Sequence, residues 1–329
     1  MASPSYFLVS VSNRRNLDLC MRHALAGFTN SITGVWTFCE VREGDFISFL
    51  YGARAHNLYG VVRREAIKDA QSLPPWPPVT FRESGRTYYF PFRLYLNHVR
   101  EFNEPLVRSE FAYVAENLLL RAGYRKTHFQ ADQTTLQNAS QMGSLWHDTR
   151  SGITPLDMPG YTTYAPLFTR QRSEKSVPLV FSFQEVILQA ALRQRLSASS
   201  RLMNFLRMIG VDSLDPNALE VLSEKAVSQG HVDLLIKESV PIGMAKKVVV
   251  EVKLGRAEIA DLVQLSEYMG EFGGECISGA LIAEGFPKAM ASKAAAVGIR
   301  LVRYSLTLDW STAKSFEEIR DALELERVS

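Results

Sequence analysis

Two carboxylates and one amine are the residues of this chain best placed to do chemistry. Glu251 and Lys253 follow a run of valines, and because side chains alternate along a strand, both point to the same face. Asp233 lies in an earlier apolar run, Val232–Ile236, which predicts the neighbouring strand, with residues 237–247 as a loose hairpin between them. Two carboxylates at one point suit a hard divalent cation such as Mg²⁺, and a nearby lysine can stabilise phosphate charge or help to deprotonate a water.

Further polar residues lie on the elements expected to surround this pair. Residues 181–188 predict the start of a helix that carries Glu185. A second helix is predicted over residues 257–272, and Gln264 and Tyr268 share one of its faces because they are four positions apart. Farther along the sequence we expect a strand over 277–283, a helix over 288–296, a strand over 299–306, and a capping box beginning at Ser315.

The order Asp233…Glu251-Val252-Lys253 resembles the motif of the PD-(D/E)XK nuclease superfamily. With Glu185 before it and Gln264-X-X-X-Tyr268 after it, the set is similar to the C-terminal domain of NucS-type mismatch endonucleases, over roughly residues 180–306. His231-Val232 stands where the superfamily usually has a proline before the first aspartate.

The resemblance implies a role for each of these residues. Asp233 and Glu251 would bind Mg²⁺ or Mn²⁺, with Glu185 assisting through the metal or its water. Lys253 would position or activate the attacking water and stabilise charge on the phosphate.

On the second helix, Gln264 would orient the water or the lysine, and Tyr268 would pack or contact phosphate. The alternative for an isolated Glu-X-Lys is the solvated face of an ordinary strand, so the prediction depends on the whole ordered set.

The composition of the chain is typical of a globular protein. The chain has 329 residues, 46% of them hydrophobic, which favours two globular domains. No apolar run is long enough to span a membrane, and the first residues lack a secretory signal, so we expect a cytoplasmic protein. The three cysteines, Cys20, Cys39 and Cys276, have neither disulfide nor zinc spacing and are expected to be buried thiols.

The N-terminal half reads as short strands separated by turns. Strands are predicted over 6–11, 58–62 and 86–94, with a turn followed by a strand within 41–52 and a helix over 104–123. Several strands with one or two helices predict a small closed barrel.

This half is similar to the EVE/YTH group of the PUA-like superfamily, over roughly residues 5–135. The resemblance is carried by Phe7-Leu-Val-Ser10-Val-Ser-Asn13, Gly34-Val-Trp36, Gly44-Asp45 and Tyr59-Gly60-Val61. It implies an aromatic cage for a modified base taken out of its stack. Trp36 and Trp76 are the candidate cage walls, and Ser10 and Asn13 the candidate edge-readers. Ordinary core packing is the alternative role for each tryptophan.

Basic residues give a mild indication of nucleic acid. The net charge is only +2, but residues 1–140 contain 14 Arg, and arginine suits bidentate contact with phosphate. Arg125 and Lys126 are the candidate backbone contacts.

These observations predict an α/β and α+β protein of two domains. Residues 1–135 are expected to form a PUA-like small β-barrel with helices, 136–175 a linker, and 176–329 a PD-(D/E)XK restriction-endonuclease-like mixed sheet flanked by helices. The predicted function is a metal-dependent DNA endonuclease, a homodimer that reads a modified base and acts in restriction. The alternatives are a NucS-like mismatch or structure-specific repair endonuclease and a non-catalytic reader of modified nucleic acid.

Overall fold

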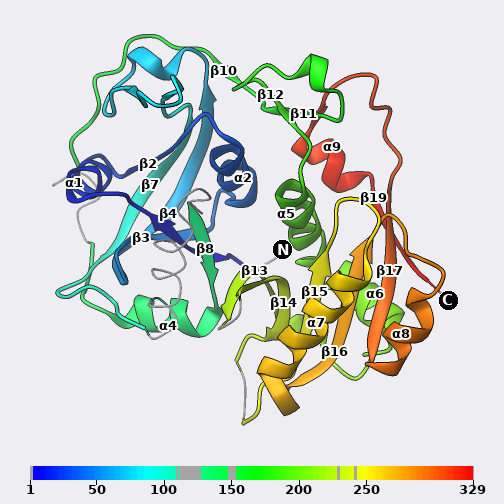
Figure 1. Ribbon diagram of the computed structural model, residues 1–329. Helices are drawn as coiled ribbons and strands as arrows, with labels where there is room; N and C mark the ends of the chain where they lie inside the picture. The colour runs from blue at the N-terminus through cyan, green and yellow to red at the C-terminus, as the bar shows by residue number, and fades with distance from the viewer. Residues whose placement is uncertain are drawn as a thin grey trace. The chain divides into compact units, whose positions relative to one another are not determined.

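The chain divides into two compact units. The computed structural model describes residues 3–108, 111, 127–146, 153–227, 230–240 and 243–328 (Figure 1). The N-terminal unit comprises Pro4–Ala131 and Thr135–Ser182, and the C-terminal unit comprises Phe183–Ser329 with the short segments Met1–Ser3 and Asp132–Thr134.

The N-terminal unit is built around a mixed sheet. The strands run in the order β2-β7-β4-β3-β1-β8, in which β1 and β3 are parallel and the other neighbours antiparallel. Its elements are β1 (Tyr6–Ser10), α1 (Arg14–His23), β2 (Leu25–Phe28), α2 (Ile32–Glu40), β3 (Phe46–Tyr51), β4 (Arg54–Ile67), η1 (Ala70–Ser72), β5 (Val79–Thr80), β6 (Thr87–Tyr88), β7 (Phe92–Glu101), β8 (His128–Ala131), α4 (Gln133–Gln141), β9 (Ser144–Leu145), β10 (Thr163–Tyr164), β11 (Leu167–Thr169), η2 (Arg172–Glu174) and β12 (Val180–Ser182).

Two predicted elements of this half differ in the structure. The strand predicted over 86–94 is divided, because β6 ends before Pro91, which has no N–H for a sheet bond, and β7 begins after it. The helix predicted from Glu104 does not start there: Leu106 exchanges two backbone hydrogen bonds of 2.9 Å with Ala55 and is extended. Most of the rest of that predicted helix lies outside the described residues.

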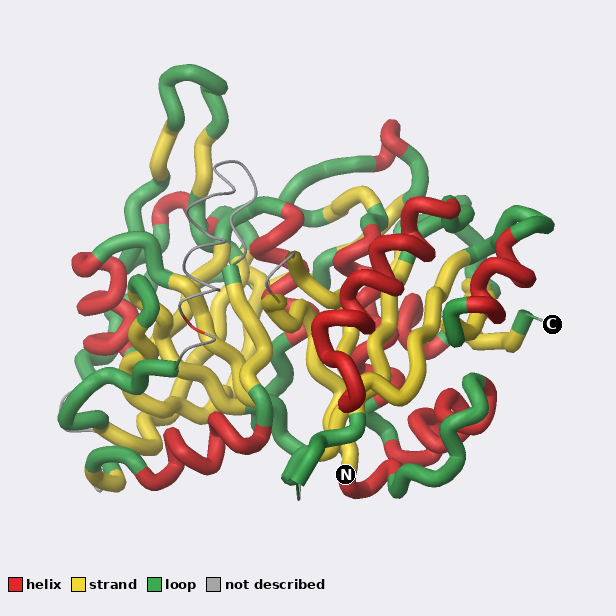
Figure 2. Tube along the Cα trace, turned by 60° about the horizontal axis from the view of Figure 1, so that its bottom comes forward, coloured by secondary structure: helices red, strands yellow, loops and turns green. Residues whose placement is uncertain are grey.

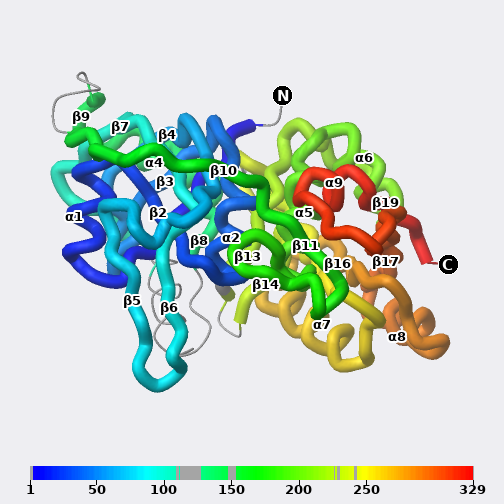
Figure 3. The backbone as a smooth tube through the Cα atoms, turned by 90° about the horizontal axis from the view of Figure 1, so that it is seen from above, coloured from blue at the N-terminus to red at the C-terminus, as the bar shows by residue number. Residues whose placement is uncertain are grey.

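The segment predicted as a linker, 136–175, lies within the N-terminal unit. It contributes most of α4, and β10 pairs with β4 through Tyr164 and Ala66. Tyr161 also donates a hydrogen bond of 2.9 Å to Glu65. These contacts attach the segment to the sheet. In Figure 3, the β5–β6 hairpin extends away from the rest of this unit.

The C-terminal unit holds a six-stranded mixed sheet. The order is β13-β14-β15-β16-β17-β19, in which β15, β16 and β17 are mutually parallel and the outer pairings antiparallel. Its elements are α5 (Glu185–Leu196), α6 (Ser199–Met208), η3 (Pro216–Ala218), β13 (Leu219–Val227), β14 (Gly230–Glu238), β15 (Lys247–Val252), α7 (Ile259–Phe272), η4 (Gly273–Glu275), β16 (Cys276–Ala283), α8 (Met290–Ala296), β17 (Ile299–Leu306), β18 (Lys314–Ser315), α9 (Phe316–Asp321) and β19 (Leu323–Arg327).

The core of this unit explains why its central strands are nearly continuous apolar runs. Helix α7 packs against β15 and β16, and α5 packs against β13, β14 and β15 (Figures 1 and 2). A strand covered by helices needs apolar residues at successive positions. Leu235, Val249 and Leu281 of three adjacent strands share one core cluster with Leu265 of α7. The predicted mixed sheet flanked by helices is confirmed.

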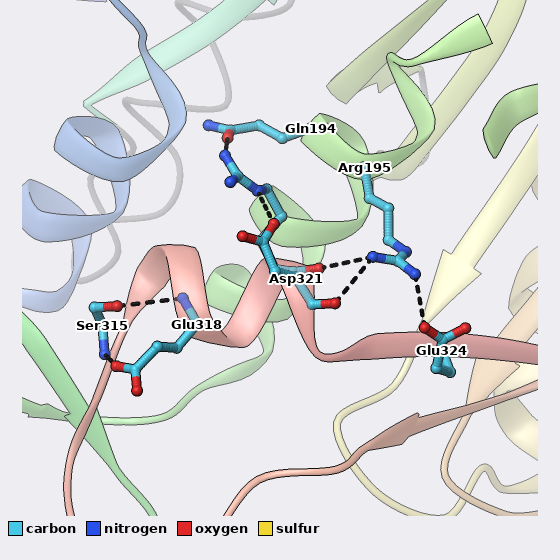
Figure 4. A network of polar contacts seen from close by, with 7 residues as sticks. Gln194, Arg195, Ser315, Glu318, Asp321 and Glu324 are labelled. Atoms are coloured by element: carbon cyan, nitrogen blue, oxygen red, sulfur yellow. Dashed lines mark hydrogen bonds and ion pairs between the residues drawn. The ribbon is translucent and has the colours of Figure 1, made fainter. Parts of the chain in front are cut away.

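Helix α9 is tied to the end of α5 by polar contacts (Figure 4). Ser315 and Glu318 form the predicted capping box at its start. Arg195 donates to the backbone carbonyls of Arg320 and Asp321 at 3.2 and 3.3 Å, and pairs with Glu324 at 3.0 Å. These bonds satisfy carbonyls that the helix end leaves free.

Candidate active site

The two carboxylates predicted to act together lie opposite each other on neighbouring strands. The antiparallel register of β14 and β15 pairs Leu234 with Val250, and one further step places Asp233 opposite Glu251. The Oδ2 atom of Asp233 accepts a hydrogen bond of 2.8 Å from the Val252 N–H, which crosses between the strands. Both side chains lie on the sheet face that α7 covers, since they are two positions from Leu235 and Val249.

Lys253 reaches this pair from the end of β15. Its Nζ lies 2.8 Å from Oε1 of Glu251 and 3.6 Å from Oδ1 of Asp261. The lysine side chain is 21% exposed and that of Glu251 only 2%. The ammonium group therefore stands at the boundary between solvent and the buried carboxylate.

Burial and mutual repulsion disturb the ionisation of all three groups. Burial, followed by the charge of Glu251, raises the pKa of Asp233 well above its usual range. Burial also raises the pKa of Glu251, although Lys253 opposes this shift. Burial alone would lower the pKa of Lys253, but the charge and hydrogen bond of Glu251, together with the charges of Asp233 and Glu185, outweigh burial, and the net shift is upward. Lys253 balances only one negative charge, so the pair Asp233 and Glu251 favours binding of a further cation.

Glu185 fixes the start of α5 to the chain just after the motif. Its Oε2 accepts a hydrogen bond of 2.9 Å from the Leu254 N–H. Its charge also contributes to the raised pKa values of Asp233 and Glu251. The structure thus brings Glu185 next to the pair, with one of its oxygens bonded to the backbone.

Gln264 and Tyr268 are bonded to each other on α7. The Gln264 amide donates to the Tyr268 hydroxyl at 2.8 Å. A methyl group on Gly230 would come within 2.7 Å of that hydroxyl, so the absence of a side chain at Gly230 lets the tyrosine reach the start of β14. This arrangement holds α7 against the strand that carries Asp233.

The donor set fits a hard divalent cation. Oε2 of Glu251 is buried and has no hydrogen-bond partner, although buried polar atoms almost always have one. A cation held by Asp233 and Glu251 would satisfy that oxygen. Over the described ranges, no group of three or more His, Cys, Asp or Glu side chains is arranged to hold a metal. The remaining ligands would then be waters or phosphate oxygens, as Mg²⁺ commonly retains.

Comparison with known proteins gives limited likeness. No protein-family model matches this chain, and no curated protein sequence matches it. A structure of EndoMS in complex with dsDNA is 25% identical over 31% of this chain and 43% of that chain, with a TM-score of 0.22. The crystal structure of a repair endonuclease from Pyrococcus abyssi is 18% identical over 38% and 49%, with a TM-score of 0.25. The match spans less than half of each solved chain.

The two predicted cage tryptophans are buried in the N-terminal unit. Trp36 is 2% exposed and meets the His128 ring edge-on, with 4.5 Å between centroids. Trp76 is 5% exposed and packs against Phe90, and the lack of a side chain at Gly27 leaves room for its ring. Both rings are core residues in this structure, which is the alternative that the sequence left open.

The predicted edge-readers lie at the start of α1 and at the end of β1. Asn13 caps α1, where its side chain accepts a hydrogen bond of 2.8 Å from the Asn16 N–H. Ser10 ends β1, and its N–H donates to the Thr127 carbonyl at 2.9 Å. Arg125 and Lys126, the predicted backbone contacts, lie outside the described residues.

His128 is a buried histidine held by two polar side chains. It is buried, with Nε2 2.9 Å from a Glu40 carboxylate oxygen and Nδ1 2.8 Å from the Thr37 hydroxyl.

In the part of the chain that the structure describes, no helix is long and apolar enough to cross a membrane.

Asp261 is the residue near the motif that sequence reasoning missed. It belongs to a capping box at the start of α7, in which its Oδ2 accepts a hydrogen bond of 2.7 Å from the Glu258 N–H. The signal was present in the sequence, because an acidic residue three positions after another at a helix start has capping-box spacing.

Proposed function

We propose that this protein is a divalent-metal-dependent endonuclease that hydrolyses phosphodiester bonds in DNA. The observation that carries the proposal is the pair of buried carboxylates, Asp233 and Glu251, with one oxygen of Glu251 left without a partner. Two buried carboxylates beside a single lysine are costly for stability, and such an imbalance is typical of sites that bind a cation.

Each residue has a role that follows from its position. Asp233 and Glu251 would hold Mg²⁺ or Mn²⁺, and the cation would acidify a water and balance charge on the phosphate. Lys253, which is partly exposed between the buried carboxylates and the surface, would donate hydrogen bonds to the water or to a phosphate oxygen.

The remaining residues act by position. Glu185 orients the chain after β15 through the Leu254 N–H, while Gln264 and Tyr268 hold α7 against β14. Their substitution would disturb geometry, to which catalytic sites are sensitive at the scale of an ångström.

The burial of both tryptophans bears on the choice of substrate. Trp36 and Trp76 offer no open ring face to a flipped base, so structure-specific or mismatch cleavage of the NucS-like kind is favoured over reading of a modified base. Restriction of modified DNA is the second candidate function, because residues 5–135 resemble the EVE/YTH group. Cleavage of both strands would require two sites and therefore a homodimer.

A cleavage panel tests this proposal. The full chain is incubated with Mg²⁺ or Mn²⁺ and matched duplexes that are plain, mismatched, flapped, or modified with N6-methyladenine, 5-methylcytosine or 5-hydroxymethylcytosine. We expect cleavage of the mismatched or flapped substrates and its loss in Lys253→Ala. Cleavage confined to one modified duplex would favour a role in the restriction of modified DNA. Binding without any cleavage would leave the non-catalytic reader.

A further inference from the structure

Lys253 has a second acidic neighbour that the nuclease motif does not include. Its Nζ is 2.8 Å from Glu251 and 3.6 Å from Oδ1 of Asp261. The side chain of Asp261 is 18% exposed, whereas that of Glu251 is 2% exposed. The ammonium group thus lies between a buried carboxylate and a more accessible one.

The start of α7 fixes the orientation of Asp261. Its Oδ2 is occupied by the Glu258 N–H at 2.7 Å, which leaves Oδ1 for the lysine. A carboxylate in the first turn of a helix is also stabilised by the helix dipole. Asp261 therefore offers a negative oxygen whose place depends on the helix, and neither Asp233 nor Glu251 is needed to hold it.

Binding of a cation at Glu251 creates a conflict with the ion pair seen in the structure. A divalent ion and the Lys253 ammonium would share one small carboxylate and would repel each other. The lysine has to give up Glu251, at least in part, while staying close enough to act on the water or the phosphate. A rotation of its flexible side chain toward Asp261 meets both needs.

We propose that Asp261 is a positioning residue, a second anchor that holds the Lys253 ammonium when a divalent cation occupies Glu251. The inference rests on the proposed metal site and adds a residue to it. Asp261 would not touch the metal or the DNA; it would act through Lys253 alone.

A double-mutant cycle on the intact chain tests this role. Mn²⁺ affinity is measured by calorimetric titration for the wild type, Asp261→Asn, Lys253→Met and the double variant. Asparagine keeps an oxygen for the Glu258 N–H but loses the charge that attracts lysine. We expect Asp261→Asn to weaken Mn²⁺ binding by about tenfold, and to have at most a twofold effect when Lys253 is already Met, because the two residues act as one pair.

Glu258→Ala is the matched control. It removes an equal charge and the other half of the capping box, in which the Glu258 side chain accepts from the Asp261 N–H. We expect it to leave Mn²⁺ affinity within twofold of the wild type. Thermal unfolding of each variant confirms that the chain is folded.

Three outcomes would overturn the inference while leaving the metal site in place. These are an unchanged affinity in Asp261→Asn, an equal loss in both lysine backgrounds, and a loss of the same size in Glu258→Ala. Absence of Mn²⁺ binding by the wild-type protein would instead refute the metal site proposed above, and the second anchor with it.

Discussion

Two clusters of one lysine with acidic side chains lie in the C-terminal unit, and they differ in how their carboxylates are paired. In the first, which we call the Lys237 cluster, Lys237 lies 3.1 Å from Glu220 and 3.3 Å from Asp132. In the second, the Lys253 site, Lys253 lies 2.8 Å from Glu251 and 3.6 Å from Asp261, while Asp233 is bonded to the Val252 N–H. Both lysines belong to the region around β14 and β15, so the same residue types have been arranged in two ways.

The difference lies in what the carboxylates bind. In the Lys237 cluster the lysine bridges both acids, and Glu220 also accepts a hydrogen bond of 3.0 Å from the Gln133 N–H. In the Lys253 site, Asp233 is bonded to a backbone N–H and one oxygen of Glu251 has no partner. Removing a lysine that is paired with both acids would leave their charges uncompensated, whereas a set with an unpaired carboxylate oxygen can still bind a cation.

The largest expected effect is a loss of cleavage activity when a carboxylate of the Lys253 site is replaced. Asp233→Asn and Glu251→Gln should each lower the single-turnover cleavage rate on the best substrate by on the order of 10³-fold, since each removes charge aimed at the reaction. Asp309→Asn, at an exposed carboxylate, is the control and should keep the wild-type rate. Activity retained within tenfold in Asp233→Asn or Glu251→Gln would mean that the paired carboxylates are not the active site.

Removal of Lys237 should destabilise the folded protein, because this lysine pairs with both Glu220 and Asp132. Lys237→Met leaves two largely buried carboxylates, 10% and 14% exposed, without this cation, and we expect the free energy of unfolding to fall by about 3 kcal/mol. Urea denaturation measures this change, with Lys288→Met as an exposed control expected to stay within about 0.5 kcal/mol. A fall of less than about 1 kcal/mol in the free energy of unfolding would mean that the Lys237 cluster is not a structural group.

The Lys237 cluster should also make stability depend on pH. Burial, only partly opposed by Lys237, raises the pKa of Glu220 from 4.5 to about 7. The folded state then binds more protons than the unfolded state between these values, so the free energy of unfolding falls as pH rises from about 4.5 to about 7. Compared with Glu220→Gln, the wild type should lose about 1–3 kcal/mol between pH 5 and pH 8. The measurement is urea unfolding at both pH values, and a constant difference between the two proteins would contradict the prediction.

The smallest expected effect is a gain in stability at the Lys253 site. Asp233→Asn removes one of two buried, mutually repelling charges while keeping an acceptor for the Val252 N–H. We expect the free energy of unfolding to rise by about 1 kcal/mol in the absence of divalent metal, a common result when a functional residue is replaced. A loss of more than about 1 kcal/mol would show that Asp233 is a structural residue.

Much of the C-terminal unit could be predicted because its sequence is locally consistent. The apolar runs of β14 and β15 and the predicted strand over 299–306 coincide with observed strands, and the Ser315 capping box starts α9 as expected. Periodicity also predicted that Glu251 and Lys253 share one face of their strand, with Asp233 on the neighbouring strand. What periodicity could not supply was the partner of each oxygen, which depends on how α7 approaches the sheet.

The N-terminal unit was harder to predict, for reasons that particular residues show. Helix α4 is polar over most of its length and buries only Thr135, Leu136 and Ala139, so its sequence resembles a linker. Trp36 lies on α2, where seven consecutive residues are buried, and helical burial on all sides leaves no periodic signal. Trp76 is enclosed by residues that are distant in sequence, which no local pattern reports.

Mn²⁺ binding tests the central claim most directly, because it compares the two lysine groups in one experiment. The full chain is titrated with Mn²⁺ and the free ion is followed by electron paramagnetic resonance, for the wild type, Glu251→Gln and Glu220→Gln. The account predicts a site in the wild type that persists in Glu220→Gln and disappears in Glu251→Gln. Unchanged binding in Glu251→Gln, or its loss in Glu220→Gln, would contradict it.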